Sequence, residues 1–251
     1  MYPYLNNDVM AQLDKSKSIS GAIGNVVFKK IGNKQILQSK PDSVRQTERT
    51  KAASSEFRQC SLWGQWLRNG LRSFLTDEAG GYMHSRLNGQ LYAAIQMNTA
   101  LPKGQRTPPN SDMSTLAGFE FNTHSPFTDY FALPIEAVLN DQQQVVVTVP
   151  EFEPKTALQF ASTTKQAELL IYVLATNFES NTGFPDDYTI IPIPNNYTAI
   201  PATTWSSQPM PKGCLILACA KLQFYNTNRF TEKHYVNTKE CSPMKVLMVG
   251  F

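Results

Sequence analysis

The residue types that most often carry catalysis are few in this sequence and stand apart from one another. Its three histidines, His84, His124 and His234, belong to no recognised metal-ligand motif. The chain also lacks a G-x-S-x-G elbow, an H-E-x-x-H helix and a Walker loop. Each histidine is therefore interpreted as a surface or hydrogen-bonding residue, and no catalytic residue is predicted.

Two acidic pairs could in principle serve a ligand. Asp186 and Asp187 could contact a cation or a sugar, but calcium needs more oxygen ligands than two adjacent side chains supply. Glu151 and Glu153 would point to one side of an extended segment. A glycosidase pair must instead face each other across a cleft. The sequence thus predicts no enzyme, no cofactor and no small-molecule substrate.

The four cysteines do not form a metal motif. Cys214 and Cys219 lack a matching second pair, and no histidine lies close to them in the sequence. Buried free thiols are the preferred interpretation, with Cys60 inside a helical pattern. A disulfide between Cys219 and Cys241 is the alternative for an exported protein. No metal site is predicted.

Length and composition indicate a folded, non-membrane chain. The sequence has 251 residues, 41% hydrophobic and 11% aromatic, which suffices for a core. No stretch reaches the roughly 18–20 apolar residues of a spanning helix, and residues 1–13 do not resemble a secretory signal. Residues 1–106 carry a net charge of +8 and residues 107–251 carry −5. The basic half could bind an anionic partner or an acidic half of the same protein.

A β-hairpin organises the start of the chain. After a polar arm at residues 1–19, an apolar run at 23–31 meets a Gly32-Asn33 turn and a second run at 34–37. Gly21 and Gly24 precede the strand, where a bend or bulge is expected. Lys29, Lys30 and Lys34 surround the turn and are candidate partner contacts, as phosphate ligands or as guards of an exposed strand edge. A linker completes residues 20–47.

Residues 48–106 predict two amphipathic helices. The first runs from 50 to 75, with apolar residues three and four apart: Phe57, Cys60, Trp63, Leu67, Leu71 and Phe74. The second runs from about 82 to 97, with Met83, Leu87, Leu91 and Ile95. They are predicted to form an antiparallel hairpin, in which Gly70 and Gly89 permit close helix contact. Trp66 lies off the first stripe, as part of a wider buried face or as an exposed anchor for a partner.

Residues 107–251 predict a β-sandwich. Apolar runs separated by turn residues occur at 116–121, 131–135, 144–149, 157–160, 167–176, 188–193, 213–224 and 244–249. Loops at 177–183 and 195–211 are rich in Asn, Thr and Pro, and Tyr197 and Trp205 in the second loop are candidate partner contacts. The expected fold class is α+β, mainly β: an antiparallel sandwich preceded by a β-hairpin and a helical hairpin.

Four segments resemble a known family: 20–28 (SGAIGNVVF), 46–57 (QTERTKAASSEF), 86–89 (RLNG) and 118–122 (GFEFN). They are similar to an uncharacterised family widespread in Bacteroidota, with an SGxxGNVV-type hairpin, a helical pair and a β-sandwich. The resemblance covers residues 20–122 and implies no activity, so it assigns no functional residue.

The favoured hypothesis is a non-catalytic subunit that binds a larger protein. Its sharpest version is a soluble plug on the periplasmic side of the outer-membrane β-barrel translocon of type 9 secretion in Bacteroidota. One alternative is a self-assembling structural protein, cytoplasmic or phage-related, that pairs through the hairpin edge and through its basic and acidic halves. The other is a carbohydrate- or nucleic-acid-binding module. Nucleic acid is disfavoured because the sequence has no dense Lys/Arg run.

Overall fold

The fold was analysed in a computed structural model, which describes residues 11–13, 15, 18–40, 46–161, 164–177, 184–228 and 230–251. The chain divides into two compact units, an N-terminal unit (residues 1–48) and a main unit (residues 49–251). Within the described residues, twelve strands form three antiparallel sheets and accompany five α-helices. The fold is α+β and mainly β, which confirms the predicted class.

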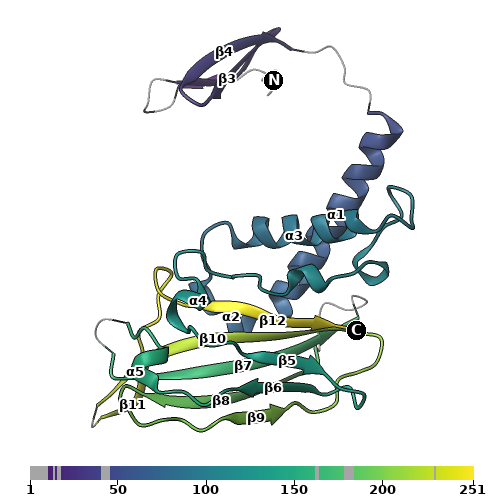
Figure 1. The fold of residues 1–251 in the computed structure, drawn as a ribbon. Helices are drawn as coiled ribbons and strands as arrows, with labels where there is room; N and C mark the ends of the chain where they lie inside the picture. Colours follow the sequence, from purple (N-terminus) through teal and green to yellow (C-terminus); the bar gives the residue numbers. More distant parts are fainter. Residues whose placement is uncertain are drawn as a thin grey trace, which may run out of the picture. The chain divides into compact units, whose positions relative to one another are not determined.

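The N-terminal unit is a four-stranded antiparallel sheet in the order β1-β2-β3-β4. The predicted hairpin is confirmed, as β3 (Val26–Ile31) and β4 (Lys34–Ser39) pair around Gly32, whose φ is +59°. Figure 1 shows these two strands side by side. The sequence did not indicate β1 (Ala11–Leu13) or β2 (Ile19–Ile23), so the predicted arm contains strand. Gly24, at φ +56°, makes the tight turn between β2 and β3.

The helices of the main unit follow the predicted apolar stripes. They are α1 (Glu48–Gly70), α2 (Arg72–Leu75), the 3₁₀ turn η1 (Thr76–Glu78) and α3 (Met83–Met97). Leu67, Leu71 and Phe74 are almost fully buried, as are Leu87, Leu91 and Ile95 of α3. Phe57 is the exception on the first stripe, because it is half exposed and meets Tyr92 edge-on. None of the described helices has the length and apolar composition that crossing a bilayer requires.

The sandwich is built from two sheets. The larger sheet contains β11 (Thr231–Tyr235), β10 (Leu215–Asn228), β7 (Gln166–Thr176) and β8 (Asp186–Pro194) in that order, and β12 (Met244–Gly250) also pairs with β10. The smaller sheet has the order β5 (Glu136–Leu139), β6 (Val145–Val149) and β9 (Thr203–Ser206). The short elements are η2 (Pro108–Asn110), η3 (Ser114–Leu116), α4 (Phe127–Tyr130) and α5 (Pro154–Ala157).

The large sheet is covered on both faces, which explains its continuously apolar strands. On one face, Val145, Val147 and Val149 of β6 pack over Leu169 and Ile171 of β7. The other face of β7 and β10 packs against α1, α2 and α3, which Figure 1 shows on one side of this sheet. The helical pair and the sandwich therefore share a core and belong to one unit. The predicted boundary after residue 106 lies inside this unit.

Three predicted strands are wrong. Residues 116–121 are not a strand, although Gly118 and Phe121 donate backbone hydrogen bonds to β12. Residues 131–135 and 157–160 contribute one isolated bridge, between Phe131 and Leu158. A short apolar run is compatible with a strand or with irregular structure. Which one forms depends on whether a neighbouring segment is available to pair with it. The predicted loop at 195–211 contains strand β9, and most of the predicted loop at 177–183 lies outside the described residues.

Candidate interaction surface

One face of the N-terminal sheet is apolar and uncovered. Because residues that pair across antiparallel strands share a face, the register defines its rows. Leu13, Ile19, Lys30 and Gln35 form one row, and Ala11, Gly21, Phe28 and Leu37 form the next. Ile23, Val26 and Ser39 form the third row. We call the side that carries Leu13, Ile19, Ile23, Val26, Phe28 and Leu37 the apolar face.

Five of the six large side chains that define the apolar face are exposed to solvent. Leu13 is 69% exposed, Leu37 60% and Ile23 52%, while Phe28 in the middle row is half-buried. Leu, Ile, Val and Phe are the residues of sandwich cores, and a sheet normally buries its apolar face against a second layer. Within the described part of the N-terminal unit no second layer exists. Contiguous exposed apolar patches of this kind mark interaction sites.

The lysines predicted as partner contacts are divided between the two faces. Lys29 and Lys34 lie on the opposite face, with Ile31 and Ile36. Lys30 lies on the apolar face, on β3, beside Gln35, which ends their shared row on β4. The Gln35 amide donates to the carbonyl oxygens of Ile19 and Lys29, which ties β4 to β2 across β3. The three lysines therefore do not form one basic patch.

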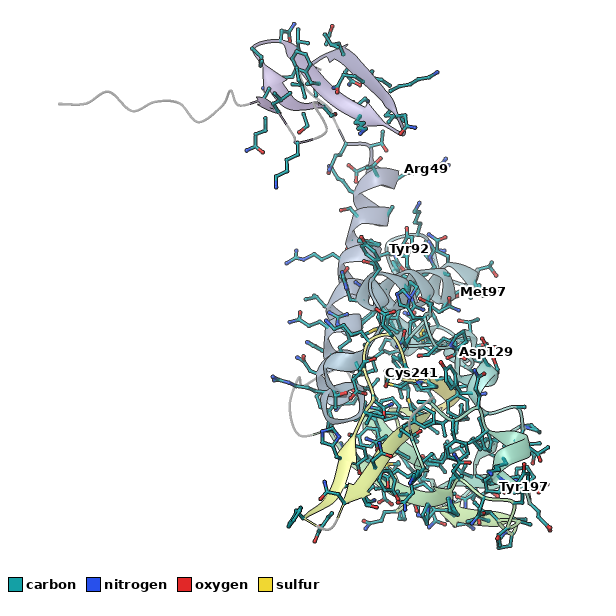
Figure 2. The ribbon with its side chains drawn as sticks, turned by 90° about the vertical axis from the view of Figure 1, so that its left-hand side faces the viewer. Arg49, Tyr92, Met97, Asp129, Tyr197 and Cys241 are labelled. Carbon is teal, nitrogen blue, oxygen red and sulfur yellow. The ribbon has the colours of Figure 1, made fainter. Side chains whose placement is uncertain are left out.

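The two tryptophans predicted as contacts pack against cores. Trp66 is partly buried against the helix-side core, which favours the wider buried face over the exposed anchor. Trp205 lies on β9, paired with Val147, and packs against the core between the sheets. Tyr197 differs, because it is 68% exposed on a loop with the Lys155 ammonium 4.5 Å from its ring centroid. Figure 2 shows Tyr197 at the far end of the sandwich from α1 and α3.

The side chains of the candidate acidic pairs make local contacts, and strand geometry separates Asp186 from Asp187. Both Asp186 and Asp187 lie on β8, so they point to opposite sides. Asp186 accepts a 2.6 Å hydrogen bond from the Tyr172 hydroxyl, and Asp187 accepts from the backbone N–H of Gln208. Burial, helped by Asp186, raises the pKa of Tyr172. Glu153 accepts from the Thr156 hydroxyl on α5. None of these contacts creates a pair of convergent carboxylates.

The histidines and cysteines are also dispersed. His124 faces Glu240 at 3.9 Å, and both side chains are mostly exposed. All four cysteines are free thiols, three of them buried. Among the described residues, no group of three or more His, Cys, Asp and Glu side chains is arranged to hold a metal ion.

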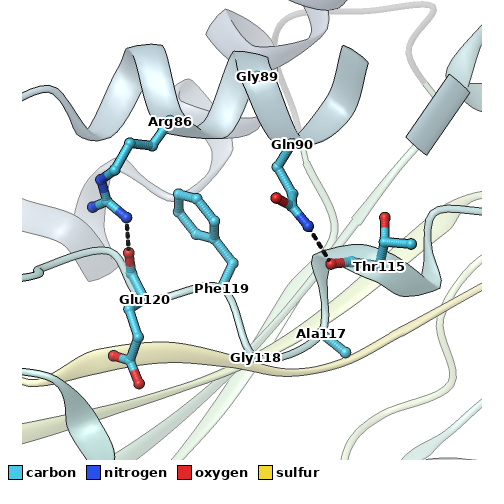
Figure 3. Close-up of a pocket in the computed structure, with 8 residues that line it drawn as sticks. All are labelled: Arg86, Gly89, Gln90, Thr115, Ala117, Gly118, Phe119 and Glu120. Carbon is cyan, nitrogen blue, oxygen red and sulfur yellow. Dashed lines mark hydrogen bonds between the residues drawn. The ribbon is translucent and has the colours of Figure 1, made fainter. Parts of the chain in front are cut away.

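A pocket of about 460 Å³ lies between α3 and the segment around η3, as Figure 3 shows. Its walls are fixed by hydrogen bonds, because Arg86 donates to the backbone oxygen of Glu120 and Gln90 to that of Thr115. The Arg86 guanidinium also lies over the Phe119 ring. The Gln90 amide and the terminal nitrogens of Arg86 hold the walls, whereas Arg86 Nε and the Thr115 hydroxyl oxygen are buried without a hydrogen-bond partner. Gly89 leaves part of the pocket open.

Buried ion pairs are the feature that the sequence did not reveal. Glu56 pairs with Arg106, and Lys221 pairs with Glu78 at 2.9 Å. Glu168 is completely buried and accepts from the Lys233 ammonium and, at 2.6 Å, from the Tyr235 hydroxyl. Burial and this carboxylate raise the pKa of Tyr235 to about 12. The only sequence signal is a charged residue inside an apolar run, as for Lys221 in 213–224 and Glu168 in 167–176. Each of these charged groups has a partner inside the fold, so we assign each pair a structural role.

Comparison with protein-family models, with curated protein sequences and with solved structures finds no match for this chain. The resemblance to a Bacteroidota family therefore stays a prediction.

Proposed function

We propose that this chain is a non-catalytic subunit that binds another protein, and that the apolar face of its N-terminal sheet is the binding surface. The single observation that carries the proposal is the exposure of five large apolar side chains, around a half-buried Phe28, on one side of a one-layer sheet. Water contact with this face costs free energy, so a protein that covers it gains the hydrophobic contribution to binding.

The main unit supports the proposal by its construction. Three of its ion pairs have at least one fully or almost fully buried member, and the candidate Asp186 and Asp187 point to opposite sides of β8. A binding role needs only a stable body and an exposed surface, whereas an enzyme needs convergent groups in a cleft. Within this proposal, the translocon barrel implied by the family resemblance is one candidate partner, with the chain as its plug.

The test compares matched variants of the tagged full-length chain. Leu37 and Ile36 are neighbours on β4 that point to opposite faces, so Leu37→Lys charges the apolar face and Ile36→Lys charges the other. Each chain is purified gently from the membranes and the cytosol of its host, and the bound proteins are identified by mass spectrometry.

A partner recovered with the wild type and with Ile36→Lys, but lost with Leu37→Lys, is the expected result. Recovery of a large outer-membrane barrel in that pattern would support the plug hypothesis. The same proteins recovered with all three chains would show that the apolar face does not bind them.

A further inference from the structure

The charge on the apolar face restricts what can cover it. Among the described residues of this face, Lys30 is the one charged side chain, because Lys29 and Lys34 lie on the opposite side. An acidic surface docked here would meet one cation, in the row at one end of the strands. Charge complementarity therefore favours an apolar occupant with little charge of its own.

The face has the dimensions of half a small β-sandwich. Four strands about 4.8 Å apart, with about five residues each at 3.3 Å per residue, present roughly 300 Å². A second sheet of equal size, with Leu, Ile, Val and Phe on its inner side, would complete a two-layer core. The same face on another molecule of this chain meets both conditions.

We propose that the occupant is a second copy of this chain, whose N-terminal sheet packs face to face on the first. This inference rests on the proposed function and names the partner at the same surface. In this dimer the two-fold axis lies between the two sheets and runs perpendicular to the strands. It places the Lys30 row of one copy over the Ile23 and Val26 row of the other. The two copies of Lys30 then lie at opposite ends of the interface, measured along the strands. Lys29 and Lys34 remain on the outer faces, in water.

The small area predicts a weak, reversible dimer. Two faces of this size bury roughly 600 Å², plus the sides of their side chains, which is below the 1,200 Å² where standard interfaces begin. Interfaces at this low end belong to transient complexes. We therefore expect a monomer–dimer equilibrium with a dissociation constant of micromolar order or weaker.

The test is sedimentation equilibrium of the full-length chain from about 1 µM to about 1 mM, the range in which interfaces of this class dissociate. The apparent mass of the wild type should rise from 28.1 kDa toward twice that value. Leu37→Lys should remain a monomer, and so should Leu13→Lys, which charges a different strand of the same face. Ile36→Lys should behave as the wild type does. Leu13 and Leu37 are largely exposed in the monomer, so circular dichroism should show unchanged strand content.

A wild type that stays monomeric throughout the range would overturn the inference. Dimers that persist in both Leu variants would also overturn it, because the contact would then use an edge or the main unit. The proposed function is tested separately, by the purification experiment. If the wild type is monomeric but a partner still depends on Leu37 in the purification, the protein-binding role stands and the occupant is a different protein.

Discussion

Arg106 holds both carboxylate oxygens of Glu56, a residue fifty positions earlier on α1. Its Nε lies 2.8 Å from Oε1 and its Nη2 lies 2.9 Å from Oε2, while the backbone N–H of Gly104 donates to Oε1 at 2.7 Å. Glu56 is completely buried, and 12% of the Arg106 side chain is exposed. This bidentate contact fastens the irregular segment after α3 to α1.

Replacing Glu56 should destabilise the main unit. Glu56→Gln leaves the Arg106 guanidinium without its counter-charge in a largely buried site, so the free energy of unfolding should fall by about 3–5 kcal/mol. Urea unfolding at pH 7 measures this change. Glu240→Gln is the matched control, because that side chain is 83% exposed and its loss should cost less than about 0.5 kcal/mol. Equal losses for the two variants would contradict the assigned role.

The same pair should make stability depend on pH. Burial raises the pKa of Glu56, but the hydrogen bonds from Arg106 and Gly104 outweigh it and bring the pKa below its ordinary value of 4.5. The unfolded chain then binds the proton more readily, so the stabilisation is present above pH 4.5 and is lost as pH falls through the folded-state pKa. The stability gap between wild type and Glu56→Gln should narrow in this window. A gap that stays constant down to pH 2 would refute it.

The buried lysine on β10 predicts an asymmetry between two substitutions. The Lys221 ammonium donates to Glu78 at 2.9 Å, to the Phe74 carbonyl at 3.1 Å and to the Thr76 hydroxyl at 3.2 Å. Glu78→Gln leaves a buried cation with neutral acceptors only, and burial already lowers the pKa of Lys221. We expect a loss of about 2–4 kcal/mol.

Lys221→Met should cost much less. It removes the buried charge, and Glu78 keeps its hydrogen bond from Ser242 and some solvent contact. In thermal unfolding, the midpoint temperature of Glu78→Gln should be clearly lower than that of Lys221→Met. The reverse order would mean that the lysine side chain, and not the pairing, supplies the stability.

Two helical glycines should respond in opposite directions to alanine. A Cβ on Gly89 would have no atom within 4 Å, so Gly89→Ala should raise the free energy of unfolding by about 0.5–1 kcal/mol through helix propensity. A Cβ on Gly70 would lie 2.8 Å from Leu174 Cδ2, so Gly70→Ala should lower it by about 1–2 kcal/mol. Urea unfolding distinguishes the two. The close contact of Gly70 is with β7, and not with the second helix as the sequence predicted.

Thiol labelling should distinguish the cysteines. Burial, aided by the charge of Glu56, raises the pKa of Cys60 to about 12, and burial alone raises the pKa of Cys219. Because the thiolate is the reactive form, Cys241, which is partly exposed, should react first with a thiol reagent in the native protein. The other three should react only after denaturation. Rapid native labelling of Cys219 would show that the core opens easily.

Much of the fold could be predicted in segments where apolar residues recur with a regular spacing, because that spacing places them on one face of a helix or strand. The apolar spacing on α1 and α3 predicted both helices and their buried stripes. The pattern around Gly32 and Asn33 predicted the pairing of β3 with β4. The segments 116–121, 131–135 and 157–160 were misassigned because a run of a few apolar residues has no period.

The candidate surface could be predicted only in part. The sequence predicted the hairpin and singled out its lysines. It did not predict β1 and β2, because these segments contain too few β-branched or aromatic residues. Without those two strands, Leu13, Ile19 and Ile23 have no place beside Phe28 and Leu37. Trp205 also looked like a loop aromatic, until pairing with β6 placed it against the core.

The sequence by itself determined which segments are amphipathic, since that property depends on the order of the residues alone. It therefore specified the helices, the hairpin and a mainly β second half. Only the tertiary structure decided which surfaces find a partner within the chain, because burial depends on contacts between residues far apart in sequence. Those contacts cover both faces of the large sheet and pair Glu56 with Arg106. They leave Leu13 and Leu37 exposed on the N-terminal sheet, which is why binding is proposed there.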